Sequence, residues 1–379
     1  MIGKTLLNHK KQNRDGKMNK LMSTAALLAL TSTGALAGGI DRSGQGVGII
    51  FEEGNRVELS FGTVSPTASG VDVANQPTGN VASSFTQASL AYRRQLTDSL
   101  SLSLIADSPF GADVSYGPTS PVLGGTFARA DSTSVSGILR YKMSDRFSVH
   151  GGIRAQQASA EVTLNGAAYG PVAGYNVKMD QDIAYGYTIG AAYEIPDIAL
   201  RVALTYHSEI DHSFQTTESI GPSSVTKVTT PKSINLDFQS GISQNTLLFG
   251  QIRWVDWSAL RFDPAAFVGA TGGGLIDLED STTYTLGVGR KFNDSWSGAV
   301  SITYEDAGKP LVSPLAPTTG KLGLTLAGVY TEGNTELTIG VNYTKLGDAQ
   351  PETGTPDVAR ASFSGNSAIG VGVKLGIAF

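Results

Sequence analysis

The chain has 379 residues, a formal net charge of -5, 16% charged residues, 46 glycines and no cysteine. The mild acidity offers no basic patch for nucleic acid, and the absence of cysteine excludes disulfides and a lipid anchor on an N-terminal cysteine. Abundant glycine with few charges favours a chain whose apolar residues are dispersed by alternation.

Residues 1–37 have the pattern of a secretory signal peptide. Lysine and arginine dominate residues 1–20, an apolar stretch covers 21–30, and Ala35-Leu36-Ala37 forms a small-residue cleavage site. Counted from Met18 this leader has ordinary length, so we expect Met18 to be the true start. No later stretch reaches the roughly 20 apolar residues of a membrane-spanning helix.

From residue 55 to residue 379 apolar and polar positions alternate in successive segments. In the first segment Val57, Leu59 and Phe61 share one face, while Glu58 and Ser60 share the other. An apolar face backed by small or charged residues suits a strand between lipid and an aqueous lumen. The pattern recurs near 84–96, 99–104, 135–141, 147–153, 183–193, 200–206, 234–238, 248–254, 284–288, 296–304, 322–330, 337–343 and 369–379.

The connections between these segments alternate between short turns and long loops. Short turns are expected near 97–98, 144–145, 196–197, 243–245, 293–294 and 332–334, and long loops near 65–83, 108–127, 165–179, 212–224, 259–279, 307–317 and 347–361. A soluble sandwich has no reason to alternate so regularly. The pattern predicts an all-β fold, a single 14-stranded antiparallel transmembrane β-barrel of the bacterial outer membrane, with about 14 strands across residues 55–379.

Four short motifs stand out along the chain: Pro109-Phe110-Gly111 closing the third strand, Ala203–Ile210, Thr230–Leu236 and Trp254–Ser258. Together they resemble the FadL-type outer-membrane transporters of long-chain fatty acids and other hydrophobic compounds. The resemblance covers the chain from about residue 38 to its end. It implies a monomeric barrel, embedded in outer-membrane lipid, whose lumen is closed by an N-terminal hatch. It also implies lateral release of a fatty acid or aromatic hydrocarbon through a kinked third strand, with no cofactor.

The hatch is the main departure from that family. Residues 38–54 form only a short N-terminal plug segment, and the family's asparagine–proline–alanine motif is absent. A thin plug leaves a more open channel as an alternative, and with it a general diffusion porin for small polar solutes. The terminal Phe379 resembles the signal read by the barrel-assembly machinery, which we expect to be a partner.

Three groups of residues are candidates for function. Pro109, Phe110 and Gly111 are predicted to interrupt the third strand as a lateral gate, because proline lacks a ladder donor and glycine permits unusual backbone angles. The alternative is that they merely end a strand.

The alternation along each strand places six cations in the lumen, where they either contact a substrate carboxylate or form a structural ladder with luminal acids. They are Arg93, Arg140, Arg154, Arg201, Arg253 and Lys374. Arg154 and Arg253 lie deepest and are the predicted carboxylate ligands. Apolar residues in the long loops predict either loop packing or a capture groove for a hydrophobic compound. They include Phe127, Phe262, Phe267 and Leu311.

Other functions fit poorly. Residues 38–379 contain only three histidines, no Gly-x-Ser-x-Gly elbow accompanies them, and they lack the companions of a metal site. We therefore expect no enzyme, no metal, no cofactor and no nucleic acid. An adhesion barrel would have polar loops. The sequence predicts an outer-membrane transporter of hydrophobic compounds, with a porin as the alternative.

Overall fold

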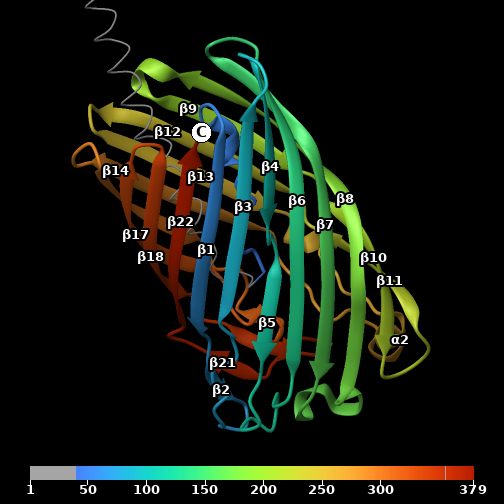
Figure 1. The fold of residues 1–379 in the computed structure, drawn as a ribbon. Coiled ribbons are helices and arrows are strands. Elements are labelled where there is room, and N and C mark those ends of the chain that lie inside the picture. The colour runs from blue at the N-terminus through green and yellow to red at the C-terminus, as the bar shows by residue number, and fades with distance from the viewer. Residues whose placement is uncertain (1–39, 355) are drawn as a thin grey trace, which may run out of the picture.

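The computed structural model describes residues 40–354 and 356–379, so the expected signal peptide lies outside the described residues. An antiparallel sheet closes on itself as a barrel (Figure 1). The closing seam joins β1 (Arg56–Thr67) to β22 (Ser367–Ala378) in a continuous register that runs from Arg56 opposite Ala378 to Thr67 opposite Ser367.

The barrel wall is made by strands that follow one another in chain order. After β1 these are β3 (Phe85–Gln95), β4 (Leu100–Asp107) with β5 (Gly111–Ser115), β6 (Phe127–Lys142), β7 (Phe147–Leu164), β8 (Tyr175–Ile195), β9 (Leu200–His207) with β10 (Ile210–Glu218), β11 (Ser224–Thr230) with β12 (Ser233–Ser243), β13 (Thr246–Val255), β14 (Ser281–Lys291), β15 (Trp296–Glu305), β17 (Lys321–Glu332), β18 (Thr335–Leu346) and β22. If each joined pair counts as one interrupted strand, the wall has 14 strands, which confirms the prediction.

The predicted two-sidedness of the strands is also confirmed. Leu59, Phe61 and their counterparts around the barrel are exposed on the outer face, where lipid would cover them. The predicted luminal cations Arg154, Arg253 and Lys374 are all buried.

The long loops gather at one end of the barrel and the short turns at the other, beside the C-terminus (Figure 1). The loop end carries small elements: β2 (Gly70–Asp72) pairs with β21 (Ala361–Phe363), β16 (Leu311–Val312) pairs with β19 (Gln350–Thr353), β19 also pairs with β20 (Val358–Ala359), and α2 (Ala265–Thr271) lies in the loop after β13. Among the described residues, no helix is long and apolar enough to cross a membrane.

One predicted loop, 212–224, is wrong. Most of it belongs to β10 and β11, which form a hairpin that prolongs the wall. In β10 the polar Asp211, Ser213 and Gln215 face outward, while Ile210 and Phe214 face the lumen and are buried. The alternation is present but inverted, so a search for outward apolar faces passes over it.

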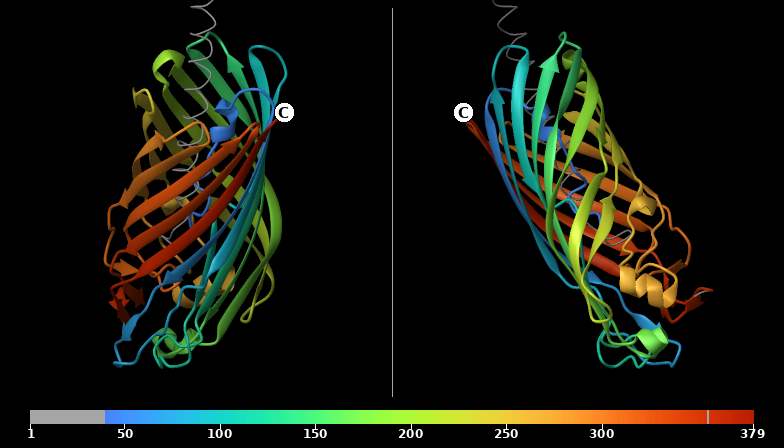
Figure 2. Two further views of the ribbon diagram at one scale, coloured as in Figure 1. Left: turned by 60° about the vertical axis from the view of Figure 1, so that its left-hand side comes forward. Right: turned by 90° about the vertical axis from the view of Figure 1, so that its right-hand side faces the viewer.

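Residues 40–54 lie inside the barrel (Figure 2). The 3-10 turn η1 (Gly48–Phe51) buries Ile49, Ile50 and Phe51 against luminal residues of β4, β6, β8 and β9. The guanidinium groups of Arg140 and Arg201 lie over the Phe51 ring, 4.6 Å and 4.4 Å from its centroid. These contacts fill the lumen toward the short-turn end.

Candidate functional site

The third strand is interrupted where the sequence predicts. β4 ends at Asp107 and β5 begins at Gly111, and both pair with β6. Pro109 has no backbone N–H to offer the ladder. The Ser132 hydroxyl replaces the missing ladder bonds, because it accepts from the Phe110 N–H at 2.9 Å and donates to the Phe110 carbonyl at 2.7 Å.

This interruption leaves a gap in the barrel wall between β3 and β5. The pairing of β3 with β4 extends only from Gln95–Ser101 to Leu90–Ala106, and within the described residues Phe85–Ser89 make no ladder with β5. The far end of β5 instead bonds to the chain just before β3, where the Ser115 N–H donates to the Val81 carbonyl at 2.8 Å.

The N-terminal segment occupies this gap from inside. Its Arg42 N–H donates to the Pro109 carbonyl, and the Gly111 N–H donates to the Ile40 carbonyl, both at 2.9 Å. The Arg42 guanidinium lies 4.4 Å from the centroid of the Phe85 ring on β3. A Cβ atom on Gly111 would lie 2.4 Å from Arg42 Cζ, so glycine makes room for this side chain. Sequence reasoning missed Arg42, since no motif marks it.

Arg253 holds the same segment in place. Its guanidinium donates to both Asp41 carboxylate oxygens, at 2.7 Å and 3.2 Å, and to Gln45 Oε1 at 3.1 Å. Its third nitrogen, Nη1, donates to Ser233 Oγ at 3.1 Å and to Asn235 Oδ1 at 2.9 Å, both on β12. Arg253 therefore has its donors engaged in the described structure.

An apolar cavity of about 80 Å³, which we call the outer cavity, opens behind the interrupted strand. Phe110 of the break is buried in its wall and makes an edge-to-face contact with Trp257, with 5.5 Å between ring centroids. Aliphatic and aromatic side chains dominate the remaining lining. They include Ile40, Phe214, Val228, Leu260, Phe262 and Ile276.

Toward the short-turn end the luminal face changes from apolar to polar. Along β7, Ala160 and Ala158 line the outer cavity, and Gln156 and Arg154 follow on the same inward face. Arg154 is 3% exposed, and within the described part of the chain its guanidinium makes no hydrogen bond or ion pair. Its acidic neighbour Asp107 accepts hydrogen bonds from two serines. Arg154 thus offers a buried positive charge on the same inward face of β7 as the outer cavity, with Gln156 between them.

The four residues predicted to form a capture groove lie in different places. Phe262 lines the outer cavity, and Phe267 of α2 packs on Tyr175 in the adjoining cluster, 4.9 Å between ring centroids. Phe127 precedes the inward-facing Ala128 and so points outward. Leu311 is 36% exposed on β16. The described structure therefore brings two of the four together.

In the described ranges no group of three histidine, aspartate or glutamate side chains is placed to hold a metal ion. The described site thus offers an apolar cavity, a luminal cation and a wall gap covered by the N-terminal segment. These are features suited to moving a molecule rather than transforming it.

Comparisons with known proteins agree with this description. A family model for the outer membrane protein transport protein family (OMPP1/FadL/TodX) matches residues 55–361. A FadL homologue of Pseudomonas aeruginosa superposes with a TM-score of 0.68 at 14% identity, covering 88% of this chain and 92% of that one. The toluene transporter TbuX of Ralstonia pickettii gives 0.63 at 14% identity, with coverage of 93% and 97%.

A third solved structure, the toluene transporter TodX of Pseudomonas putida, gives a TM-score of 0.62 at 13% identity, with coverage of 87% and 91%. A search of the curated proteins found no match. At these identities the superpositions show a shared fold.

Proposed function

Because this chain belongs to the OMPP1/FadL/TodX family of outer membrane transport proteins, we propose that it takes up hydrophobic compounds, foremost long-chain fatty acids, by passive capture and lateral release. The family consists of transport proteins, so the chain is an outer-membrane β-barrel and not an enzyme. The substrate and the route are the parts that are proposed.

One observation carries the proposal: the apolar outer cavity and the wall break share Phe110 and Gly111. A hydrocarbon chain gains about 0.8 kcal/mol for each CH₂ group removed from water, so an apolar cavity retains such molecules where a water-filled pore would not. Because the same residues border the wall gap, a molecule in this cavity lies next to a sideways exit.

The N-terminal segment supplies the closing element of this route. Residues 40–42 form hydrogen bonds with the backbone groups of Pro109 and Gly111 that no neighbouring strand pairs with. The Arg42 side chain extends across the gap toward Phe85. A shift of this segment would uncover the gap without disturbing the continuous ladder between β6 and β7. We expect residues 38–54 to act as a movable plug.

For a fatty acid, Arg154 is the favoured ligand of the carboxylate. It is buried, shares the inward face of β7 with the cavity-lining Ala158 and Ala160, and makes no hydrogen bond or salt bridge among the described residues. Arg253 was an equal candidate from sequence, but a substrate would have to displace Asp41 from it. The tail would then occupy the outer cavity while the head group lies inward.

Two of the solved structures described above are named as toluene transporters. Their names support hydrophobic compounds as the substrate class and make aromatic hydrocarbons a second candidate substrate. Nothing in the comparisons supports the porin alternative. We further expect a monomer in outer-membrane lipid, inserted by the barrel-assembly machinery through Phe379.

Labelled oleate uptake tests the proposal, in cells that lack their own transporter and with a small polar sugar as control. Oleate entering without the sugar is the expected result. Sugar entering at a comparable rate would mean that the plug leaves an open pore, and the hydrophobic-uptake proposal would fall.

A further inference from the structure

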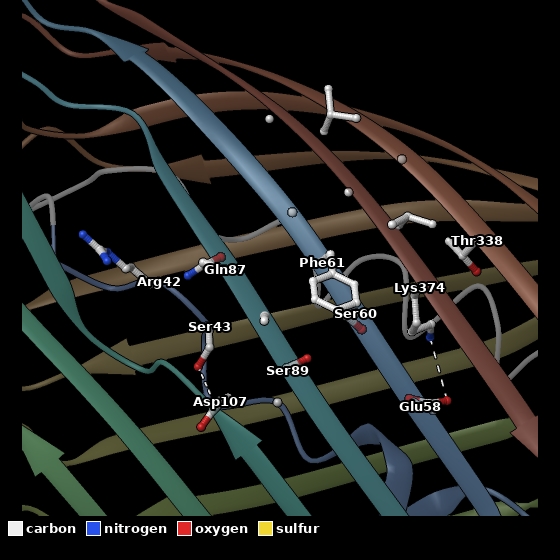
Figure 3. Close-up of a pocket in the computed structure, with 18 of the residues that line it drawn as sticks. Arg42, Ser43, Glu58, Ser60, Phe61, Gln87, Ser89, Asp107, Thr338 and Lys374 are labelled. Atoms are coloured by element: carbon white, nitrogen blue, oxygen red, sulfur yellow. Dashed lines mark hydrogen bonds and ion pairs between the residues drawn. The ribbon is translucent and has the colours of Figure 1, made fainter.

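A second and larger cavity, which we call the inner cavity, lies between the N-terminal segment and the opposite side of the lumen. Its volume is about 200 Å³, and it is bounded by the inner faces of β1, β3, β17, β18 and β22 (Figure 3). It reaches Asp107 and Ser108 at the edge of the wall gap. The inner cavity is therefore a second space next to the proposed exit.

Glycine creates much of this space. Gly340 of β18 and Gly372 of β22 line the cavity, and a Cβ atom on either would have nearest neighbours at 3.6–3.7 Å, an ordinary contact distance. Neither residue has a positive φ. Backbone geometry and close packing therefore do not demand glycine at these positions, and the missing side chains leave the lumen hollow.

Two buried polar groups lining this cavity lack hydrogen-bond partners among the described residues, although Lys374 forms a long ion pair with Glu58. Lys374 is 4% exposed and Thr338 is 3% exposed, and neither Lys374 Nζ nor Thr338 Oγ1 makes a hydrogen bond within the described residues. The nearest acid to Lys374 is Glu58, at 4.0 Å, and its carboxylate already accepts from Arg56 at 2.7 Å. Figure 3 shows Lys374 and Thr338 together on one side of the cavity, with Gln87 on the other.

Gln87 Nε2 is likewise buried without a partner, whereas the neighbouring Asn342 donates to Thr325 at 3.0 Å. The three groups without a hydrogen-bond partner are an ammonium, a hydroxyl and an amide N–H, and each can donate a hydrogen bond. Leaving such groups buried and unpaired costs free energy, so the arrangement favours a bound species rich in acceptor oxygens.

The depth of the inner cavity adds to that cost. The outward-facing residues that alternate with Thr338, Gly340, Gly372 and Lys374 on β18 and β22 are exposed apolar side chains: Ile339, Val341, Val371 and Val373. The cavity therefore lies at the level of the hydrocarbon layer, where water is scarce outside the wall.

We propose that the inner cavity is a second binding site, which takes the carboxylate head of a long-chain amphiphile through Lys374 and Thr338 while its chain leaves through the gap between β3 and β5. This assignment rests on the proposed uptake of fatty acids. It makes Lys374 a residue that distinguishes carboxylates from plain hydrocarbons, because a hydrocarbon gains nothing from an ammonium group.

The first test compares uptake of labelled oleate and of labelled toluene in the cell assay. Lys374→Met and Thr338→Val are each expected to reduce oleate uptake, Lys374→Met by about tenfold, and to leave toluene uptake at the wild-type rate. Lys374→Met leaves Glu58 paired with Arg56, so the barrel should still assemble. Wild-type oleate uptake in both variants, or equal losses for both compounds, would overturn the assignment.

A matched pair of glycine variants tests the space itself. Gly340→Leu fills the inner cavity, whereas Gly328→Leu places the same side chain on the exposed outer face of β17, where a Cβ atom meets nothing within 4 Å. Only Gly340→Leu should slow oleate uptake. Equal rates in the two variants would show that the cavity is not on the route.

A direct measurement separates this site from the proposed function. Crystals of the full chain soaked with a brominated long-chain carboxylate should show density for its head group beside Lys374. Density in the outer cavity alone would overturn the inner site and leave fatty-acid uptake standing. Failure of the wild-type chain to take up oleate would instead overturn the proposed function, whatever the variants do.

Discussion

The two halves of the barrel wall are built differently. From β13 to β22 each wall strand runs without interruption and pairs with the next wall strand in continuous register. From β4 to β12 three strands are interrupted, before Gly111, before Ile210 and before Ser233. The interruptions before Gly111 and before Ser233 border the outer cavity, which Phe110, Gly111, Thr230 and Pro231 line. Two of the three breaks thus coincide with the site.

The reason lies in what replaces the lost ladder bonds. At the third strand, Ser132 and residues 40–42 provide them. At the break between β9 and β10, Ser208 makes two hydrogen bonds to the backbone of Tyr187. The Tyr187 N–H donates to the Ser208 hydroxyl, and the Ser208 N–H donates to the Tyr187 carbonyl, both at 2.9 Å. In the continuous half the backbone ladders between neighbouring strands run unbroken, and the wall there depends on them.

The largest loss of stability is expected when a proline interrupts a strand of the continuous half. Ser301→Pro, in the middle of β15 between Gly287 and Thr325, removes a ladder donor at membrane depth and should destabilise the barrel by about 3 kcal/mol or more. Pro231→Ser, at a natural break, should leave stability unchanged. Urea unfolding followed by heat-modifiable electrophoretic mobility measures both, and equal stabilities would contradict the distinction between the halves.

Sealing the natural break should abolish uptake while the barrel remains folded. Pro109→Val with Gly111→Val restores a backbone donor and expels Arg42 from its place, so β5 can approach β3. Oleate uptake is expected to fall to the level of cells without the chain. Retention of uptake by a correctly folded double variant would remove the lateral-gate idea.

Replacing Arg154 and replacing Arg253 should have different effects on the binding of a long-chain carboxylate and its methyl ester. Arg154→Met is expected to weaken binding of a long-chain carboxylate by roughly tenfold and leave its methyl ester unaffected, because only the acid forms a charge-assisted hydrogen bond. Arg253→Met should affect acid and ester alike and lower stability by about 3 kcal/mol, since Asp41 loses its buried partner. Binding to the purified protein measures this, and acid-specific loss in Arg253→Met alone would reverse the roles.

The smallest effect concerns the outer loops. Burial, followed by the nearby Asp357, raises the pKa of Glu352 to about 7, and Glu352 Oε2 has no hydrogen-bond partner in the described chain. An acid with a raised folded-state pKa favours the ordered loop at low pH, and this contribution is lost as pH rises toward 7. Proteolysis of the loop should therefore quicken from pH 5 to pH 8 in the native chain and stay constant in Glu352→Gln. Unchanged rates in both would discount the titration.

Much of the wall was predictable because its alternation is strict. Residues such as Leu59 and Phe61 must face lipid, so the period of two alone assigns their side and the strand count follows. The break at Pro109 was predictable from proline's missing donor. The hairpin of β10 and β11 was missed because its outward residues are polar. Strands were predicted only where the outward face is apolar, so this segment was assigned to a loop.

The site was less predictable because its contacts join distant parts of the chain. Arg253 meets Asp41 across 212 positions, and no local pattern marks Asp41 or Arg42 as partners of the wall. The alternation along the strands placed Arg154 and Arg253 equally in the lumen. Only the course of residues 40–54 shows that Arg253 is hydrogen-bonded to Asp41 and Gln45, whereas Arg154 has no such bond in the described structure. The same applies to Lys374, whose ammonium forms a long ion pair with Glu58 but no hydrogen bond within the described residues.

The outward faces of the strands also show how high the outer cavity stands. On β7 its inward-facing residues Ala158 and Ala160 alternate with the polar Gln157, Ser159 and Glu161, and on β6 the exposed outer surface carries an ion pair between Arg129 and Asp131. Such side chains belong above the hydrocarbon layer, among hydrated sugars and head groups. If the outer cavity binds substrate as proposed, the molecule would be collected beyond the reach of the membrane's own acyl chains, which would otherwise compete with it for the same apolar walls.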